Sequence, residues 1–244
     1  MEGDIIFGAR PVLEAIDSGK EINRIYIRKG AETPLVMQIA ERATNRGIVV
    51  QYVPVEKLNR LTRNNHQGVV AEVSPVEYYE IEEIVEKLKE EPGKMPLIVL
   101  MDSITDIRNF GAIARSAECA GADAIVMPKK NSAPVNGEAV KSSAGALNII
   151  PVCRVGSIRN TLKMLAMEGY SIAAATEKAP QSVYDADLNK PLVIVMGSED
   201  KGISRDVLKM CDTQVSIPMR GKTESLNVSA AAAVILFETL RQRR

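Results

Sequence analysis

Residues 192–196 (LVIVM) form an uninterrupted apolar run, and this pattern constrains the fold more strongly than any other feature of the sequence. A strand with one face in water alternates apolar and polar side chains, whereas a strand covered on both faces is apolar throughout. Similar apolar segments at 97–101, 124–127, 149–152 and 171–175 alternate with helical patterns. The second part of the chain is therefore predicted to be an α/β domain, with a doubly wound parallel sheet flanked by helices and ligands at the carboxyl ends of its strands.

The first 74 residues show a shorter alternation of helical and extended patterns. Helical patterns at 10–16, 35–44 and 55–61 are interleaved with strand patterns at 25–27, 48–53 and 69–73, which predicts a small α/β/α domain. Residues 75–94 are rich in glutamate, keep a helical apolar stripe and end at a Pro-Gly break, so they are interpreted as an acidic linker. The expected organisation is a domain at 1–74, the linker at 75–94 and a larger domain at 95–244.

Charge and composition exclude several classes of site. The chain has 31 basic and 31 acidic residues, so a site for a polyanion has to be a local patch. Its one histidine, His66, and its three cysteines, Cys119, Cys153 and Cys211, are too far apart for the usual structural zinc site or a disulfide framework. A histidine-assisted nucleophile would have to use His66. We expect no metal and a reducing, cytoplasmic environment.

The pattern of the sequence also predicts no signal peptide, no membrane span and no complete nucleotide-binding loop. The first residues are acidic and no apolar run approaches the ~18 residues of a membrane span, so we expect a soluble protein without a membrane partner. Residues 197–204 have the glycine spacing of a phosphate-binding loop, but Ile203 occupies the lysine position, and Glu199 and Asp200 would repel a nucleotide. No dinucleotide-binding glycine motif follows any strand.

Three polar segments remain, each directly after an apolar strand. They cover residues 102–115, 197–199 and 216–229, and in a doubly wound sheet they would converge on one edge. Taken singly, each has a structural explanation: Ser225 is a plausible N-cap of the last helix, and Arg115 an exposed helical arginine. Their occurrence together, in this order, favours a functional site.

These segments resemble the motifs of a known family. The pattern NxGAIxRSA at 109–117, GxExxG at 197–202, and SIPM at 216–219 followed by SLNVS at 225–229 closely resemble the three motifs of the TrmH-like branch of SPOUT RNA ribose 2′-O-methyltransferases. FGARPVLEA at 7–15 and HQGV at 66–69 are similar to the accessory domain of its ribosomal RNA guanosine-2′-O members, a domain related to ribosomal RNA-binding proteins.

The resemblance implies a fold, an activity and partners. It implies a deep C-terminal trefoil knot, S-adenosylmethionine bound in that knot, and a homodimer with the active site near the interface. The favoured reaction is methylation of a ribose 2′-hydroxyl, of a guanosine in large-subunit ribosomal RNA. Transfer RNA as the substrate, and a non-catalytic RNA-binding protein with a vestigial knot, are the alternatives. RNA is the expected partner, and neither DNA nor a membrane is.

Residues for the methyl donor follow from the motifs. The resemblance assigns donor contacts to Gly197, Ile217 and Leu226. Met196 and Met219 would add apolar walls, and we include Thr176, at the end of the strand 171–175, as a further candidate. The methyl donor is neither phosphate-rich nor metal-bound, which agrees with the missing phosphate loop and metal site.

Residues for the acceptor come from the same motifs. The resemblance gives the role of base to Arg115, but a guanidinium is effectively always protonated. Our hypothesis is that Arg115 grips the target phosphate and the developing alkoxide, with Glu199 orienting it, while Asn109 and Ser225 or Asn227 position the ribose. Asn109 and Arg115 would lie ~120° apart on one helix, so we expect Asn109 in the turn before the helix.

The remaining predictions concern RNA contacts and one departure from the motifs. Asp106-Ile107-Arg108 stands where the family usually has Asp-Pro before the asparagine, which frees the backbone locally and removes no catalytic group. Candidate RNA contacts are the basic residues that lie outside the motifs, namely Arg10, Arg60, Arg63, Lys129, Lys130 and residues 241–244. His66 is interpreted as a hydrogen-bonded structural residue. The small residues 230–233 suit either a dimer contact or core packing.

Overall fold

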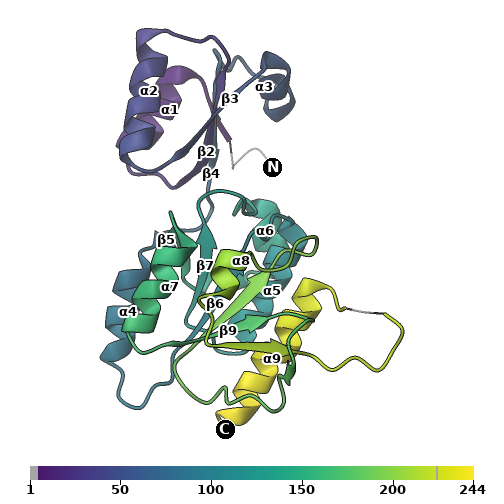
Figure 1. The fold of residues 1–244 in the computed structure, drawn as a ribbon. Helices are drawn as coiled ribbons and strands as arrows, with labels where there is room; N and C mark the ends of the chain where they lie inside the picture. The colour runs from purple at the N-terminus through teal and green to yellow at the C-terminus, as the bar shows by residue number, and fades with distance from the viewer. Residues whose placement is uncertain (1–4, 224) are drawn as a thin grey trace. The chain divides into compact units, whose positions relative to one another are not determined.

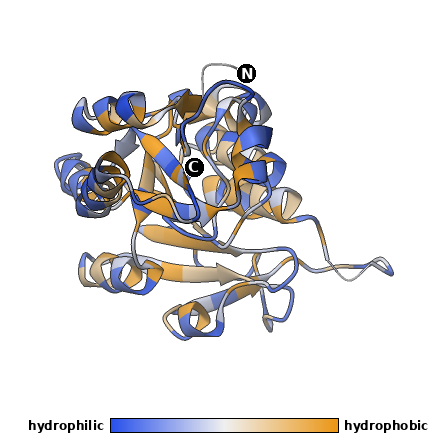
Figure 2. Ribbon diagram, turned by 90° about the horizontal axis from the view of Figure 1, so that it is seen from above, coloured by the Kyte–Doolittle hydropathy of each residue, from blue (hydrophilic) through white to orange (hydrophobic). Residues whose placement is uncertain are grey.

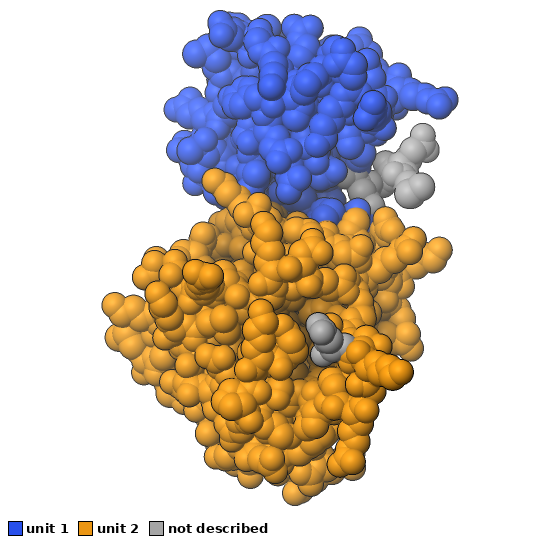
Figure 3. Space-filling model, turned by 45° about the vertical axis from the view of Figure 1, so that its right-hand side comes forward, with its two compact units in different colours: residues 1–77, 134–137 blue, residues 78–133, 138–244 orange. Residues whose placement is uncertain are grey.

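The computed structural model describes residues 5–223 and 225–244. The described chain divides into two compact units, coloured separately in Figure 3. Unit 1 contains the chain up to Glu77 together with Pro134–Gly137, and unit 2 contains Tyr78–Ala133 and Glu138–Arg244. The buried side chain of Asn23 donates from Nδ2 to the carbonyl oxygen of Val135 at 2.8 Å, which helps to hold the segment Pro134–Gly137 in unit 1.

Unit 1 is a four-stranded sheet with helices on both faces (Figure 1). Its strand order is β1 (Ile5–Phe7), β4 (Val69–Val73), β2 (Ile22–Arg28) and β3 (Val49–Val53). The apolar faces of α1 (Ala9–Asp17) and α2 (Pro34–Asn45) pack on one side, and α3 (Val55–Leu61) contributes Leu58 to a smaller cluster on the other. This confirms the predicted α/β/α arrangement and adds β1, which the sequence pattern did not reveal.

Unit 2 contains an eight-stranded sheet in which every neighbouring pair of strands is parallel. Its apolar strands appear in orange in Figure 2, and the predicted doubly wound parallel sheet is confirmed. Listed in spatial order, the strands are β10 (Gln181–Ser182), β12 (Thr213–Ser216), β9 (Ser171–Ala175), β11 (Leu192–Gly197), β6 (Leu97–Asp102), β7 (Ala124–Pro128), β8 (Val152–Val155) and β5 (Tyr78–Tyr79).

Helices cover both faces of this sheet (Figure 1). On one face, α4 (Ile81–Lys89), α7 (Ile158–Met167) and α8 (Arg205–Leu208) bury their apolar residues in a shared core with the strands. On the other, α5 (Ile107–Cys119) and α9 (Val228–Gln242) pack against each other. A shorter helix, α6 (Gly137–Ser142), follows β7. The expected acidic linker thus contains a helix, α4, whose apolar stripe belongs to the core of unit 2.

One predicted strand is displaced. The expected strand at 149–152 is wrong in its position, because β8 begins only at Val152 and Ile149 is 70% exposed after a short 3-10 helix, Ala146–Asn148. Pro151 has no amide hydrogen to donate to a strand ladder, so the paired strand starts at the next residue, Val152. Within the described part of the chain, no helix has the length and apolar character needed to cross a membrane.

Candidate functional site

The three polar segments meet at one edge of the large sheet. Gly197, the last residue of β11, lies opposite Asp102, the last residue of the neighbouring parallel strand β6. β12, which ends at Ser216, lies in the same sheet on the far side of β9. All three segments therefore begin at the carboxyl edge, as the sequence pattern predicts.

A cavity of about 260 Å³ opens at this edge. Its apolar wall includes Val215 from β12 and Ala231 and Ile235 from α9. All six residues expected to bind the methyl donor line it: Thr176, Met196, Gly197, Ile217, Met219 and Leu226. Three of the five residues expected to act on the acceptor line it as well: Glu199, Ser225 and Asn227.

The charged side chains in the described lining of the cavity are all acidic. Glu177 and Glu199 are among its lining residues, and the described lining contains no lysine or arginine. Carboxylates repel phosphate groups and attract cations at this range. The cavity therefore suits a neutral or cationic ligand with an apolar part, and does not suit a nucleotide polyphosphate.

The loop after β11 is closely packed and closed by backbone hydrogen bonds. A Cβ built on Gly197 would lie 2.2 Å from the carbonyl carbon of Gly202, so only glycine fits there. Ser198 and Gly202 exchange two backbone hydrogen bonds, of 3.2 and 2.8 Å. The loop is a tight hairpin, and Glu199 is the first of the three residues between Ser198 and Gly202.

Asp102 fastens the far end of this loop, and the sequence analysis missed its role. Its carboxylate is 5% exposed and accepts hydrogen bonds from the amide of Ser204 at 2.8 Å and the hydroxyl of Ser103 at 3.1 Å. The available signal was a carboxylate ending an otherwise apolar strand. Its partner, 102 residues later in the chain, could not be inferred from the sequence.

Asn227 joins all three motifs. Its Nδ2 donates to Oδ1 of Asn109 at 3.0 Å and also to Oε1 of Glu199. Its Oδ1 accepts from the amide of Ser229 at 2.9 Å, which makes Asn227 the N-cap of α9. The cap of the last helix is therefore Asn227, and Ser225 lies exposed before it.

The structure corrects the predicted position of Asn109. Helix α5 begins at Ile107 because the carboxylate of Asp106 accepts hydrogen bonds from the amides of Arg108 and Asn109, at 2.8 and 2.9 Å. Asn109 thus lies in the first turn of the helix, not in the turn before it. This cap also fixes the turn without the proline that the family usually has.

Arg115 is separated from the other predicted residues. It is exposed on α5, about 120° around the helix from Asn109, and neither residue lines the cavity. Among the described residues it has no hydrogen-bond or ion-pair partner. The expected contact between Arg115 and Glu199 is therefore absent within a single described chain.

The basic C-terminus serves the fold of unit 2. Arg241 forms a two-pronged ion pair with Glu238, at 2.7 and 2.8 Å. Arg243 donates to the carbonyl oxygens of Met95, Pro96, Leu188 and Lys190. The guanidinium group of Arg243 therefore ties the end of α9 to neighbouring segments of unit 2, whereas the pair of Arg241 lies within α9 itself. Contact of these arginines with RNA stays a prediction.

The buried cysteines and the histidine are held in environments that do not favour a catalytic role. Burial raises the pKa of the Cys153 and Cys211 thiols to about 12, so neither supplies a thiolate at neutral pH. His66 accepts from the amide of Gly68 at Nδ1 and pairs through Nε2 with Asn59. Across the described residues, no three His, Cys, Asp or Glu side chains are arranged to hold a metal ion.

Comparison with known proteins now gives the family. Residues 96–237 match the model of the SpoU rRNA Methylase family, and residues 5–79 match the RNA 2′-O ribose methyltransferase substrate binding model. The chain belongs to the SpoU rRNA methylase family. This confirms the resemblance drawn from the three motifs, and the protein is an enzyme of a methyltransferase family.

Relatives of this SpoU family member match it over almost the whole chain. A putative TrmH family tRNA/rRNA methyltransferase of Staphylococcus haemolyticus is 36% identical over 243 residues, covering 100% of this chain and 97% of its own. YacO of Bacillus subtilis, with the same description, is 35% identical and covers 98% and 96%.

Solved structures agree with this assignment. The SpoU methyltransferase AviRb of Streptomyces viridochromogenes, in complex with the cofactor AdoMet, has a TM-score of 0.62 at 26% identity, covering 98% of this chain and 90% of its own. An AdoMet-bound rRNA methyltransferase of Sinorhizobium meliloti has a TM-score of 0.61 at 26% identity, covering 98% and 87%.

Proposed function

We propose that the protein transfers a methyl group from S-adenosylmethionine to a ribose 2′-hydroxyl of RNA, with a guanosine of large-subunit ribosomal RNA as the favoured substrate. The observation that carries this proposal is the cavity where the three motifs meet, with apolar walls, two carboxylates and no cation in its described lining. The two AdoMet-bound relatives support the choice of methyl donor.

The cavity fits this donor in shape and in charge. The main chain at Gly197, Ile217 and Leu226, which line the cavity, would hold its polar edges. Met196 and Met219 would enclose its apolar surface, and Thr176 supplies a hydroxyl at the rim. When bound, the donor supplies an electrophilic methyl group on a positively charged sulfur, which the nearby carboxylates tolerate.

The chain's own residues would position the acceptor. Asn109, Asn227 and Glu199 form a hydrogen-bonded group beside the cavity, and Ser225 lies next to it. These groups would hold the ribose hydroxyl in line with the methyl group. Arg115 would bind the adjacent phosphate and stabilise the developing alkoxide, while the proton leaves to a phosphate oxygen or to water.

We propose that the active form is a homodimer, because Arg115 does not line the cavity of its own chain. Phe237 is 49% exposed on α9, which packs against the helix that carries Arg115. In the proposed dimer, α5 and α9 of the two subunits lie at the interface, and the partner subunit's Arg115 reaches the cavity. Mixing Arg115→Ala protein with Glu199→Gln protein should then restore activity, since a mixed dimer holds one intact site. If the mixture stays inactive, this arrangement is wrong.

We also propose the division of labour that the family implies. Residues 1–74 would bind the RNA substrate, and 95–244 would carry the methyltransferase site in a deep trefoil knot. The acidic segment 75–94 would connect them, with its helix α4 packed in the core of unit 2. The free thiols of Cys119, Cys153 and Cys211 are compatible with activity in the reducing cytoplasm.

The decisive experiment uses a labelled methyl donor and separate pools of ribosomal and transfer RNA. Label in ribosomal RNA, mapped to a 2′-O-methylguanosine, is the expected result, and label confined to transfer RNA would select the alternative substrate. Calorimetry with S-adenosylmethionine separates an enzyme from a non-catalytic RNA-binding protein, for which no heat of binding is expected. Near wild-type activity in both Arg115→Ala and Arg115→Lys would exclude the proposed role of Arg115.

A further inference from the structure

The backbone of α5 comes very close to another segment of unit 2 at Gly111, two residues after Asn109. A Cβ built on Gly111 would lie 2.4 Å from the Cβ of Ser142 and 2.9 Å from the amide nitrogen of Ser143. Figure 1 shows α6, which ends at Ser142, beside α5. Residues 142–147 are here called the support turn. Ordinary contact starts at 3.4 Å, so α5 lies about 1 Å closer to this turn than a methyl group at Gly111 would allow.

The side chain of Ser143 holds the support turn together. It is fully buried, and its Oγ donates to the carbonyl oxygen of Val140 at 2.9 Å and accepts from the amide of Leu147 at 3.3 Å. Between these partners, Ala144 adopts a left-handed φ of 50°, a conformation that residues with a Cβ rarely take. The turn therefore has a defined and strained shape where it meets α5.

Helix geometry relates this contact to the two functional residues of α5. Successive residues of an α-helix are turned by about 100°, so Asn109 leaves the helix about 160° from Gly111. On that side it accepts a hydrogen bond from Nδ2 of Asn227 at 3.0 Å. Arg115 leaves the helix about 40° from Gly111, because four residues make slightly more than one turn. The support turn therefore lies on the side of α5 from which Arg115 extends, and Asn109 extends from the other side.

A small rotation of α5 would displace both functional side chains. Side chains reach about 5–6 Å from the axis of a helix, so a rotation of about 10° moves their ends by about 1 Å. A side chain at Gly111 would require a displacement of the same size. Misplacement of positioning groups by about 1 Å can lower a rate about a hundredfold. The close contact is therefore tight enough to matter for the chemistry.

We propose that Ser142 and Ser143 are positioning residues for methyl transfer. Through the contact with Gly111 they set the rotation of α5 about its axis, and thereby the directions of Asn109 and Arg115. The inference rests on the proposed function for the roles of these last two residues. It adds two serines that lie outside the three motifs, and it gives the glycine of the first motif a part in the geometry of the site.

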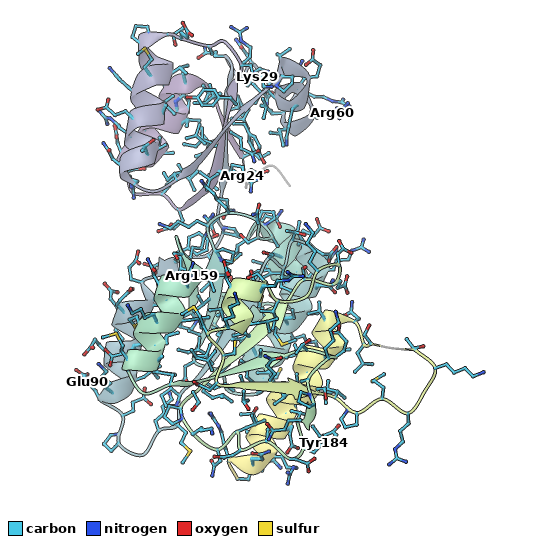
Figure 4. The ribbon with its side chains drawn as sticks, viewed as in Figure 1. Arg24, Lys29, Arg60, Glu90, Arg159 and Tyr184 are labelled. Carbon is cyan, nitrogen blue, oxygen red and sulfur yellow. The ribbon has the colours of Figure 1, made fainter. Side chains whose placement is uncertain are left out.

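Two substitutions test the contact from both sides. Gly111→Ala should lower kcat for methyl transfer to total RNA about a hundredfold. The Kd for S-adenosylmethionine should stay at the wild-type value, because neither Gly111 nor Ser142 lines the cavity. Adding Ser142→Gly removes the nearest atom and should recover about tenfold of the lost kcat. Gly156→Ala is the matched control, since nothing lies within 4 Å of a Cβ there. It precedes α7, the helix of Arg159 in Figure 4, on the opposite face of the sheet.

A third substitution tests the support turn without changing the contact itself. Ser143→Ala removes both hydrogen bonds of Oγ and should lower kcat about tenfold, again with an unchanged Kd for S-adenosylmethionine. Ser143→Cys keeps a weak donor and acceptor and should fall between the alanine variant and the wild type. Urea unfolding of each variant shows how much of it is folded under the assay conditions, so a lower kcat is not mistaken for a loss of folded protein.

A further measurement follows the hydrogen bond of Asn109 and needs no methylation. In ¹⁵N-labelled protein, the Nδ2 resonances of Asn227 should shift in Gly111→Ala, return toward their wild-type positions in the double variant, and stay unchanged in Gly156→Ala. Unchanged Asn227 resonances in Gly111→Ala would overturn the proposal. So would a double variant that regains stability but neither kcat nor the wild-type resonances. If the wild type methylates no RNA while the resonances respond as described, the proposed function fails and the positioning of Asn109 by the support turn stands.

Discussion

The side-chain amide of Asn227 donates a hydrogen bond to Oδ1 of Asn109, which lies 118 residues earlier in the chain. The same amide group donates to Glu199, so one side chain connects the three polar segments that follow β6, β11 and β12. Asn227 also caps α9. These two functions use different atoms of the side chain. Oδ1 accepts from the amide of Ser229 in the helix cap, and Nδ2 donates to Asn109 and Glu199. A substitution can therefore remove one function and keep the other.

Asn227→Asp should keep the helix cap and lose the hydrogen bonds to Asn109 and Glu199. An aspartate oxygen still accepts from the amide of Ser229, whereas its second oxygen would face Glu199 and Asn109 without a hydrogen to donate. We expect stability close to wild type and a fall in kcat/KM of at least about tenfold, since a hydrogen bond to a charged acceptor contributes about 1.5–3 kcal/mol. Asn227→Ala should in addition lose about 1 kcal/mol of stability. Urea unfolding and methyl-transfer assays measure the two effects, and full activity in Asn227→Asp would count against the role of the network.

Asp102→Ala should loosen the hairpin that carries Glu199. It removes the charged acceptor of the Ser204 amide from a partly buried hydrogen bond, at a cost of about 1–3 kcal/mol. Asp102→Asn keeps one acceptor oxygen and should fall between the alanine variant and the wild type, both in urea unfolding and in kcat. Ser103→Ala, which removes only the 3.1 Å bond to the same carboxylate, is the matched control. If Asp102→Ala lowers activity no more than Ser103→Ala does, the carboxylate does not position the loop.

Gly197→Ala should disrupt the methyl-donor cavity. Its new Cβ would lie 2.2 and 2.3 Å from backbone atoms of Gly202 and Ile203, and these cannot move without opening the hairpin. We expect a loss of about 1–3 kcal/mol of stability, as in other overpacked sites, and no measurable S-adenosylmethionine binding by calorimetry. Gly221→Ala is the control, because nothing lies within 4 Å of a Cβ there. Equal binding by the two variants would contradict the proposed cavity.

The sequence predicted the sheet and the meeting of the motifs because both depend on regular patterns. Uninterrupted apolar strands require a sheet covered on both faces, and parallel strands place their carboxyl ends at one edge. What it missed depends on single side chains with distant or unusual partners. The start of α5 is set by the carboxylate of Asp106, and the start of β8 by the missing amide hydrogen of Pro151. The partner of Asp102 exists only in the folded chain.

The position of Arg115 shows the same limit in the candidate site. Its motif pointed to the correct helix and the correct edge of the sheet, and the geometry of a helix already placed it on a different side from Asn109. A position of Asn109 in the turn before the helix would bring the two residues together within one chain. The cap at Asp106 excludes this solution, and a second copy of the chain becomes the alternative that we propose.

Arg243→Ala should destabilise unit 2 without changing the chemistry at the site. The guanidinium donates to four carbonyl oxygens in the segments before β6 and β11, and the alanine variant leaves these acceptors to water. Since the group is partly exposed, we expect a loss of about 2 kcal/mol, within the range for hydrogen bonds to charged groups. Arg244→Ala, at an exposed neighbour, should unfold as wild type. Urea unfolding of both variants, with KM for S-adenosylmethionine measured well below the transition, checks this. A changed KM with unchanged stability would show that Arg243 acts on the site. It would contradict the structural role that we assign to its four hydrogen bonds.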